Sequence, residues 1–154
     1  MTDSLPRSVT IASGLDALTH SIEASTAVNG SAMTRAIAME AAVQILENLE
    51  EAAADGEMTP AKKEAREKMH IASGLAGVAI TNACAGLAHS YDHPGPAFGF
   101  AHGNICGIIV LSNKSFFVFV SGSINTAQDV VSEPVPLVVG TETWTAFFPS
   151  AGSA

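Results

Sequence analysis

The strongest constraint on the fold is a stripe of apolar residues that recur every four positions in the first half of the chain. The stripe consists of Ile37, Ala41, Ile45 and Leu49, beside Ala38, Ala42 and Leu46. This spacing predicts an amphipathic helix, because residues four apart lie on one helical face. The helix should begin near Ser31 and end within the stretch EEAAADGEM, where Gly56 can adopt the positive φ that commonly closes a helix.

Two further segments carry helical periodicity, one on each side of this stretch. Residues 13 to about 28 have apolar residues at helical spacing, with Ser13 as a candidate N-cap and Asn29-Gly30 as the stop. Thr59-Pro60 places an N-cap candidate before a proline at the first helical position, which predicts a third helix over AKKEAREKMHIASGLAGVAITNA. The charged first half of this helix should face solvent, and its second half should be buried.

The rest of the chain divides into a short helix, a loop and an apolar tail. A fourth helix should run from about Ala83 to His93, because the following proline disfavours helical geometry in the residue before it. A loop through Gly103 should follow, and residues 104–111 could form a short helix or a strand. Residues 115–154 contain no Lys or Arg and include the runs FFVFV, VPLVV and WTAFF, which indicates strands. We expect a helical domain over residues 1–114 and a divergent, strand-like tail over residues 115–154.

Charge and cysteine content bear on partners and compartment. Seven Lys+Arg against fifteen Asp+Glu give a net charge of -8, which repels nucleic acid and anionic membranes, so we expect neither as a partner. The most apolar region, residues 105–120, is interrupted by Ser-Asn-Lys and is shorter than the roughly 20 residues that cross a bilayer. Two cysteines without a disulfide pattern, and an N-terminus without an apolar signal segment, favour a soluble protein in the reducing cytoplasm.

Four of the five histidines fall in two short windows, where they can converge on a metal ion. Asp16 and His20 are four residues apart in the first predicted helix, so both side chains project from one face. His89 and His93 repeat this spacing in the fourth helix, and His102 follows in the loop. Imidazoles with one carboxylate form a mixed nitrogen and oxygen site for Fe(II), Zn(II) or Mn(II). An ordinary surface pair or internally bonded pair is the alternative for Asp16 and His20.

The remaining residues that could carry chemistry have simpler interpretations. His70 lies away from both windows and should be a partly exposed or core histidine. Cys84 and Cys106 should be small apolar core residues, because nothing near either one in the sequence marks an activated thiolate. Asp92 could orient a metal-bound imidazole as an outer carboxylate, or it could be a solvated acid at a helix end.

Several runs together resemble the helical, metal-binding part of the iron-containing (group III) alcohol dehydrogenases. They are LPRSVTIASGLDALTHSIEA, EAREKMHIASGLAGVAITNA, LAHSYDHP and AHGNICGIIVL. The runs are also similar to the alcohol dehydrogenase half of bifunctional aldehyde-alcohol dehydrogenases, and their order and spacing agree over about residues 4–114. The resemblance implies a mainly α fold, the helical metal-binding domain of the iron-containing alcohol dehydrogenase (dehydroquinate synthase-like) fold.

The resemblance also implies roles for individual residues. An aspartate and three histidines hold the metal in that family, and they fall on Asp16, His20, His89 and His102. His93 would be a catalytic neighbour of the substrate, in proton relay. The implied enzyme is an oxidoreductase in which a divalent metal, Fe(II) or alternatively Zn(II), lowers the pKa of an alcohol so that hydride passes to NAD(P). Alcohols and aldehydes would be the substrates.

The sequence departs from the pattern of that family in three places. It contains no Gly-rich loop of the kind that holds the nicotinamide pyrophosphate, the link from His93 to His102 is one residue shorter, and the resemblance stops near Lys114. We therefore expect a truncated catalytic domain without its own nucleotide-binding domain, whose exposed apolar faces favour a homo-oligomer. The alternatives are a non-catalytic metal-binding helical module or inactive truncated product, and the glycerol dehydrogenase or dehydroquinate synthase branch, against which the DALTH run argues.

Overall fold

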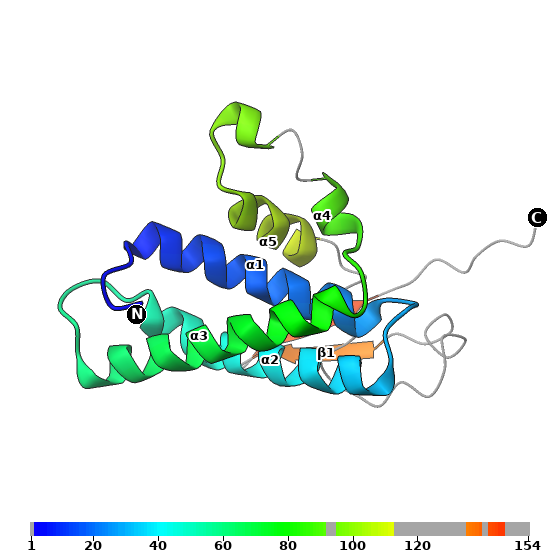
Figure 1. The fold of residues 1–154 in the computed structure, drawn as a ribbon, viewed down its shortest axis with the longest axis horizontal. Helices are drawn as coiled ribbons and strands as arrows, with labels where there is room; N and C mark the ends of the chain where they lie inside the picture. Colours follow the sequence, from blue (N-terminus) through cyan, green and yellow to red (C-terminus); the bar gives the residue numbers. More distant parts are fainter. Residues whose placement is uncertain (1, 92–94, 113–134, 140–141, 147–154) are drawn as a thin grey trace, which may run out of the picture. The chain divides into compact units, whose positions relative to one another are not determined.

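Long helices make up most of the chain that the computed structural model describes, namely residues 2–91, 95–112, 135–139 and 142–146. The chain divides into two units, Met1–Val110 and Leu111–Ala154. The helical elements are α1 (Arg7–Thr26), α2 (Ala32–Ala52), α3 (Pro60–Thr81), α4 (Leu87–Tyr91), the short 3-10 helix η1 (Gly95–Phe98) and α5 (His102–Ser112) (Figure 1). No described helix is both long and apolar enough to cross a membrane.

The starts of α2 and α3 lie where the sequence predicts them. Ser31 Oγ accepts a hydrogen bond from the Thr34 amide at 3.1 Å, and Thr59 Oγ1 accepts one from the Lys62 amide at 3.0 Å. Each side chain satisfies one of the amide donors that the first turn of a helix leaves without a partner. Gly56 follows α2 with a φ of 88°, as expected for the turn between the two helices.

The predicted starts of the first and fourth helices were wrong. Helix α1 begins directly after Pro6, so Ser13 is an interior residue whose hydroxyl donates to the Val9 carbonyl at 2.8 Å instead of capping the helix. Helix α4 begins only at Leu87, because Cys84 has a φ of 73°, which no residue inside a right-handed helix adopts. The predicted end of α4 at His93 and Pro94 lies outside the described residues.

Helix α5 settles the alternative that the sequence left open for residues 104–111, which are helical. It also begins earlier than expected. His102 was predicted in a loop, but it is the first residue of α5, and a backbone bond from the Ile105 amide to the Ala101 carbonyl at 3.3 Å closes the first turn.

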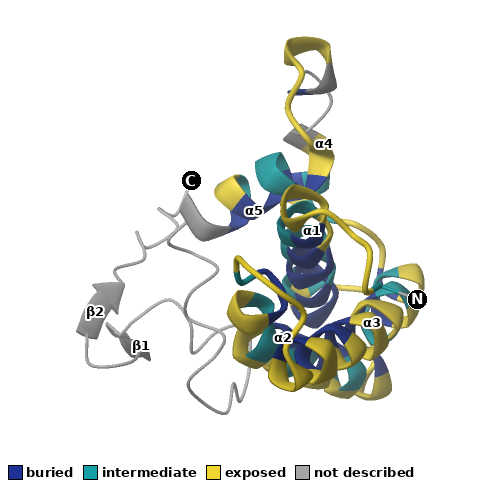
Figure 2. Cartoon of the chain, turned by 90° about the vertical axis from the view of Figure 1, so that its left-hand side faces the viewer, coloured by how far each residue is buried: buried dark blue, intermediate teal, exposed yellow. Residues whose placement is uncertain are grey.

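The core lies where α1, α2 and α3 pack together, and it is built mostly from alanine. Its fully buried members include Ala38, Ala41, Ile45, Ala72 and Ala76. Such small side chains allow helix axes to approach closely, and Figure 2 shows the buried faces of these helices turned toward one another. Helix α1 lies between the α2–α3 pair on one side and α4 with α5 on the other (Figures 1 and 2).

The prediction that the second half of α3 is buried was wrong. A buried stripe of Ala65, Met69, Ala72, Ala76 and Ala79 runs along the whole helix. On the opposite face, Ile71 and Val78 are 54% and 52% exposed. The physical reason is that α1 and α2 cover only one face of α3, so burial follows the helical period and not the position along the helix.

Two cations close the end of α2 against the chain that leads into α1. Arg66 is 4% exposed, and its Nε donates to the Ala52 carbonyl at 3.0 Å. Its Nη1 donates to the carbonyls of Thr2, Asp3 and Leu5 at 2.6, 3.1 and 3.1 Å. Lys62 Nζ donates to the Ala54 and Gly56 carbonyls at 2.7 and 3.2 Å. Positive charge is favoured at a helix C-terminus, and here it also fixes the N-terminal segment that precedes α1.

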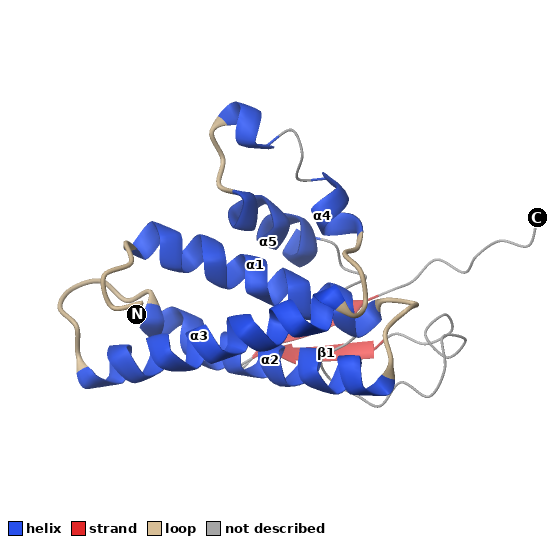
Figure 3. Ribbon diagram, viewed as in Figure 1, coloured by secondary structure: helices blue, strands red, loops and turns tan. Residues whose placement is uncertain are grey.

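The second unit contains two short strands, β1 (Val135–Val139) and β2 (Glu142–Ala146). They pair antiparallel, with Val135 opposite Ala146 and Leu137 opposite Trp144. Figure 3 draws the strands in red. Both strands fall in the segment whose composition indicates strand-like structure, while the described chain as a whole is mainly helical, as predicted.

Candidate metal centre

One carboxylate oxygen and three imidazole nitrogens converge beside α1. Asp16 Oδ1 lies 3.0 Å from His102 Nε2, 3.4 Å from His89 Nε2 and 4.0 Å from His20 Nε2. The rings of His20 and His89 are stacked, with centroids 4.6 Å apart. The structure therefore brings together the four side chains that the resemblance implies as ligands. His93 lies outside the described residues.

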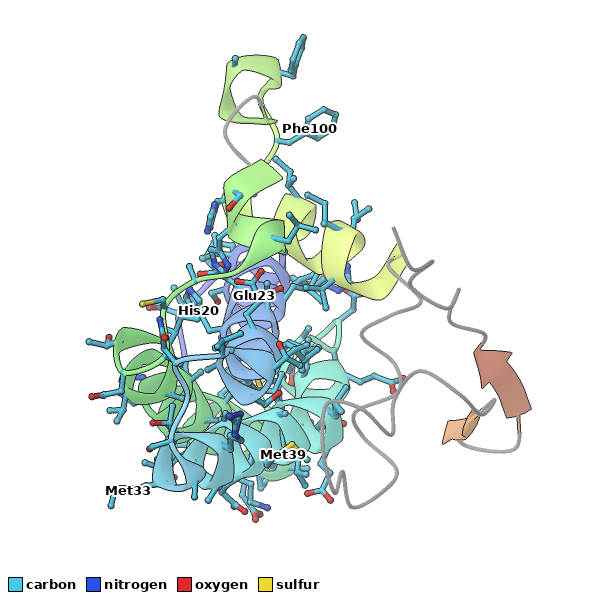
Figure 4. All side chains as sticks on the ribbon, turned by 90° about the vertical axis from the view of Figure 1, so that its right-hand side faces the viewer. His20, Glu23, Met33, Met39 and Phe100 are labelled. Carbon is cyan, nitrogen blue, oxygen red and sulfur yellow. The ribbon has the colours of Figure 1, made fainter. Side chains whose placement is uncertain are left out.

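Three helices position these side chains. Asp16 and His20 project from one face of α1, the face opposite the alanine core, while His89 comes from α4 and His102 from the first turn of α5. Figure 4 labels His20 beside α1. Two glycines allow α5 to lie against α1. A Cβ on Gly103 would collide with the Ala12 carbonyl oxygen, and one on Gly107 would lie 2.9 Å from Leu15 Cβ. Gly103, which follows His102 in the sequence, thus has a steric role, because it lets α5 lie against α1.

The chemistry and spacing of these residues fit a divalent cation. Asp16 Oδ1 and His89 Nε2 are buried, and neither makes a hydrogen bond within the part of the chain that the structure describes. Buried polar atoms in this condition require an explanation. Two atoms that bind a tetrahedral ion at about 2.1 Å lie about 3.4 Å apart, and the separation of Asp16 Oδ1 from His89 Nε2 is 3.4 Å. Carboxylate and imidazole are ordinary ligands of Fe(II) and Zn(II).

The electrostatic environment keeps His20 suited to bind a metal. Burial is the largest cause that lowers the pKa of His20 below its ordinary value, and His89 and His102 add to this effect. Asp16 and Glu23 oppose the decrease without cancelling it. A neutral imidazole near pH 7 offers the lone pair that a metal ion requires.

The structure also groups a sulfur atom with three of these residues, in a set that does not include His20. Asp16, His89, His102 and Cys106 each offer one ligand atom within 4.8 Å of the others, and Cys106 Sγ lies 3.7 Å from His102 Nε2. Cys106 is buried, as expected, but it borders the cluster instead of lying only among apolar side chains. No local sequence pattern predicts this position, because it depends on the start of α5 at His102, which places Cys106 one helical turn further on.

The structure also tests the sequence interpretations of Cys84 and His70. Cys84 was predicted in the core, but it is exposed, since the chain turns at this residue with a positive φ. His70 is exposed on α3, which agrees with one of the two interpretations given for it.

Sequence reasoning missed Glu23, whose side chain is only 1% exposed and contacts the cluster directly. Its Oε2 lies 2.6 Å from His89 Nδ1. Asp92, the residue considered for such a contact, lies outside the described residues. A signal was present in the sequence, because Glu23 stands seven residues after Asp16 and three after His20, and so shares their helical face.

Comparison with known proteins shows which family shares these features. Residues 10–117 match the Fe-containing alcohol dehydrogenase family, C-terminal. The NADPH-dependent butanol dehydrogenase of Clostridium saccharobutylicum is 41% identical over 104 residues, which are 67% of this chain and 25% of that protein. The NAD-dependent methanol dehydrogenase of Bacillus methanolicus is 41% identical over 113 residues, 73% of this chain and 28% of that protein. The chain therefore spans about a quarter of the length of these relatives.

Solved structures show the same likeness. An iron-containing alcohol dehydrogenase superposes with a TM-score of 0.66 and 32% identity, over 76% of this chain and 31% of that chain. An iron-containing alcohol dehydrogenase from Thermotoga maritima has a TM-score of 0.66 and 30% identity, over 76% of this chain and 32% of that chain. Both likenesses confirm the predicted fold class, a helical domain of the iron-containing alcohol dehydrogenase fold.

Proposed function

The chain belongs to the iron-containing alcohol dehydrogenase family, and from this premise we propose that it provides the metal-binding part of an NAD(P)-linked oxidoreductase for small alcohols and aldehydes. The observation that carries the proposal is the convergence of Asp16 Oδ1 with three imidazole nitrogens at 3.0 to 4.0 Å. The relatives named above are a butanol dehydrogenase and a methanol dehydrogenase, which supports a short-chain alcohol as substrate. In domain terms, the catalytic part comprises residues 1–114 and the tail residues 115–154.

We propose that Asp16, His20, His89 and His102 hold the metal, with Fe(II) favoured by the family name and Zn(II) as the alternative. When bound, such a cation supplies the Lewis acidity that polarises an alcohol or carbonyl oxygen for hydride transfer. The ligand side chains differ in exposure. The His89 side chain is 13% exposed and the His102 side chain 43%, so the more open side of the cluster adjoins α5. We propose that the substrate reaches the cluster from that side.

A proton must enter or leave when an alcohol and a carbonyl compound interconvert. We propose His93 for this step, because it follows the ligand His89 by four residues in the sequence and the resemblance to the family implies it as a neighbour of the substrate outside the ligand set. A His93→Ala variant should lower turnover while the metal content stays at the wild-type level. Loss of metal in this variant would instead make His93 a ligand.

Metal analysis of the purified chain tests the proposal. The wild-type protein, expressed with iron and zinc supplied, should contain about one equivalent of metal per chain, as expected for a single site of this ligand number. The His70→Ala variant removes an exposed imidazole distant from the cluster and should retain the metal. A wild-type chain with no iron or zinc above background would contradict the proposed centre.

A titration with NADH tests the oxidoreductase part of the proposal against its main alternative, a non-catalytic metal-binding module. NADH fluorescence changes when the nicotinamide leaves water, so binding is measured directly. Saturable binding of NADH by the metal-loaded chain would favour the oxidoreductase. Metal binding without NADH binding is expected of both, because the sequence contains no Gly-rich loop of the kind that holds the pyrophosphate.

A further inference from the structure

We propose that Glu23 is the positioning residue of this centre, because it fixes both the tautomer of His89 and the backbone that carries it. The carboxylate of Glu23 is almost completely buried, and its two oxygens accept three hydrogen bonds from one short segment. Oε2 contacts His89 Nδ1 at 2.6 Å and accepts from the Gly86 amide at 2.8 Å, while Oε1 accepts from the Ala88 amide at 2.6 Å.

The contact with Nδ1 determines which ring nitrogen of His89 is available to a metal. An ionised carboxylate only accepts hydrogen bonds, so a neutral His89 must carry its hydrogen on Nδ1. Its Nε2 then keeps a lone pair, and this atom lies 3.4 Å from Asp16 Oδ1, which is also an acceptor. Two acceptors face each other without a hydrogen between them. A cation between the two atoms turns this unfavourable pair into a favourable one.

The two amide contacts fix the position of the ring as well as its tautomer. Gly86 and Ala88 lie three residues and one residue before His89, and their amides connect this segment to α1 through the Glu23 carboxylate. The space at Gly86 is limited, since a Cβ there would lie 2.8 Å from Glu23 Oε1 and 2.9 Å from its Cδ. Glycine at this position thus permits the backbone to approach the carboxylate.

Both oxygens of Glu23 are engaged by these donors, so Glu23 acts on the metal through His89 and is not itself a ligand. Outer carboxylates of this kind orient metal-binding histidines and make them more basic, and their loss typically weakens metal binding about 10- to 100-fold. The inference rests on the proposed metal centre. Its first test, however, needs no metal, because the tautomer of His89 is a property of the metal-free protein.

The test compares the wild-type full chain with Glu23→Gln, which keeps the side-chain shape but replaces one acceptor oxygen with an amide donor. Side-chain ¹⁵N NMR of the metal-free protein should show His89 as the Nδ1–H tautomer in the wild type and a shift toward Nε2–H in the variant. Competition titration with Zn(II) should show affinity about 10- to 100-fold lower in Glu23→Gln. Glu47→Gln makes the same chemical change on the exposed face of α2 and should alter neither measurement.

Circular dichroism identifies a variant that fails to fold. If Glu23→Gln is unfolded, the Gly86→Ala variant is measured in its place. The added Cβ moves the Glu23 carboxylate away from His89 without removing its charge, so the same change of tautomer is expected. A folded variant that keeps the Nδ1–H tautomer and wild-type Zn(II) affinity would overturn the role of Glu23. If the wild type binds no metal but Glu23→Gln still changes the tautomer, the metal proposal fails while the positioning role stands.

Discussion

Two buried polar regions of the helical unit solve the same physical problem in opposite ways. At the C-terminal end of α2, Arg66 and Lys62 donate hydrogen bonds to carbonyl oxygens that the helix end and adjacent turns present. Beside the other face of α1, Asp16 Oδ1 and His89 Nε2 lie 3.4 Å apart and have no hydrogen-bond partner among the described residues. In the first region the chain supplies both donors and acceptors. In the second, Asp16 Oδ1 faces His89 Nε2, which is also an acceptor when His89 carries its hydrogen on Nδ1.

The difference separates a structural role from a binding role. A buried polar group without a partner costs about 1–3 kcal/mol, so a chain selected only for stability would pair the atoms beside α1 as it pairs those at the end of α2. A cation between Asp16 Oδ1 and His89 Nε2 would stabilise this pair of acceptors. We therefore expect mutations in the α2 region to change folding, and mutations in the cluster to change metal binding.

The largest effect should follow from Asp16→Ala. This change removes the oxygen that lies 3.0 to 4.0 Å from a nitrogen of each of the three imidazoles. We expect metal affinity to fall by more than about 100-fold, beyond the loss typical of an outer residue. Without metal, the variant should unfold at a urea concentration no lower than the wild type does, because an unpartnered carboxylate is gone. Metal analysis and urea titration of the same samples check both statements. A metal-free Asp16→Ala protein that is clearly less stable than the metal-free wild type would break the comparison.

The second effect is on stability and concerns the α2 region. Arg66→Met keeps the aliphatic stem but removes hydrogen bonds to Ala52 and to the N-terminal segment. Charge-assisted bonds to buried acceptors are worth about 1.5–3 kcal/mol each, of which part is recovered by water, so we expect a loss of about 2–4 kcal/mol in the free energy of unfolding. Lys63→Met on the exposed surface of α3 is the matched control and should change stability by less than about 0.5 kcal/mol. Metal content of the folded Arg66→Met protein should match the wild type.

The third prediction distinguishes the two candidates for the fourth ligand. His20→Ala should weaken Zn(II) binding more than Cys106→Ser does, because the imidazole of His20 stacks on the ligand His89 and keeps its lone pair near pH 7. For Cys106→Ser we expect the Zn(II) affinity to fall by less than about 10-fold, which is below the loss typical of a residue that acts through a ligand. The Co(II)-loaded protein provides an independent check. A sulfur-to-cobalt charge-transfer band that disappears in Cys106→Ser would make Cys106 a ligand.

Local sequence signals predicted the parts of the fold that depend on neighbours along the chain. Ser31 and Thr59 cap their helices because each side chain needs only an amide three residues away. The i, i+4 spacing of Asp16 and His20 likewise places both side chains on one face of α1. The resemblance to a family, and not the spacing alone, predicted that Asp16 and His20 share one metal site with His89 and His102.

The features that sequence reasoning missed depend on contacts between helices. The partners of Glu23 are amides more than sixty residues away in the sequence, and no local pattern indicates them. The buried stripe of α3 depends on which face meets α1 and α2, so the contrast expected between its two halves was wrong. The start of α5 at His102 depends on Gly103 fitting against the Ala12 carbonyl.

The smallest effect should be a pH dependence of the stability of the metal-free protein, which we assign to His20 in the cluster. Burial lowers the pKa of His20 in the folded protein below its ordinary value of 6.5, so the unfolded chain binds this proton more tightly than the folded one. Stability of the metal-free protein must then rise with pH through the window below 6.5, where the unfolded imidazole loses its proton, and level off above it. His20→Gln should reduce this slope, as measured by urea titration between pH 5 and 7.5, whereas Arg66→Met should lower stability by the same amount at every pH. A slope unchanged in His20→Gln would assign the pH dependence to another group.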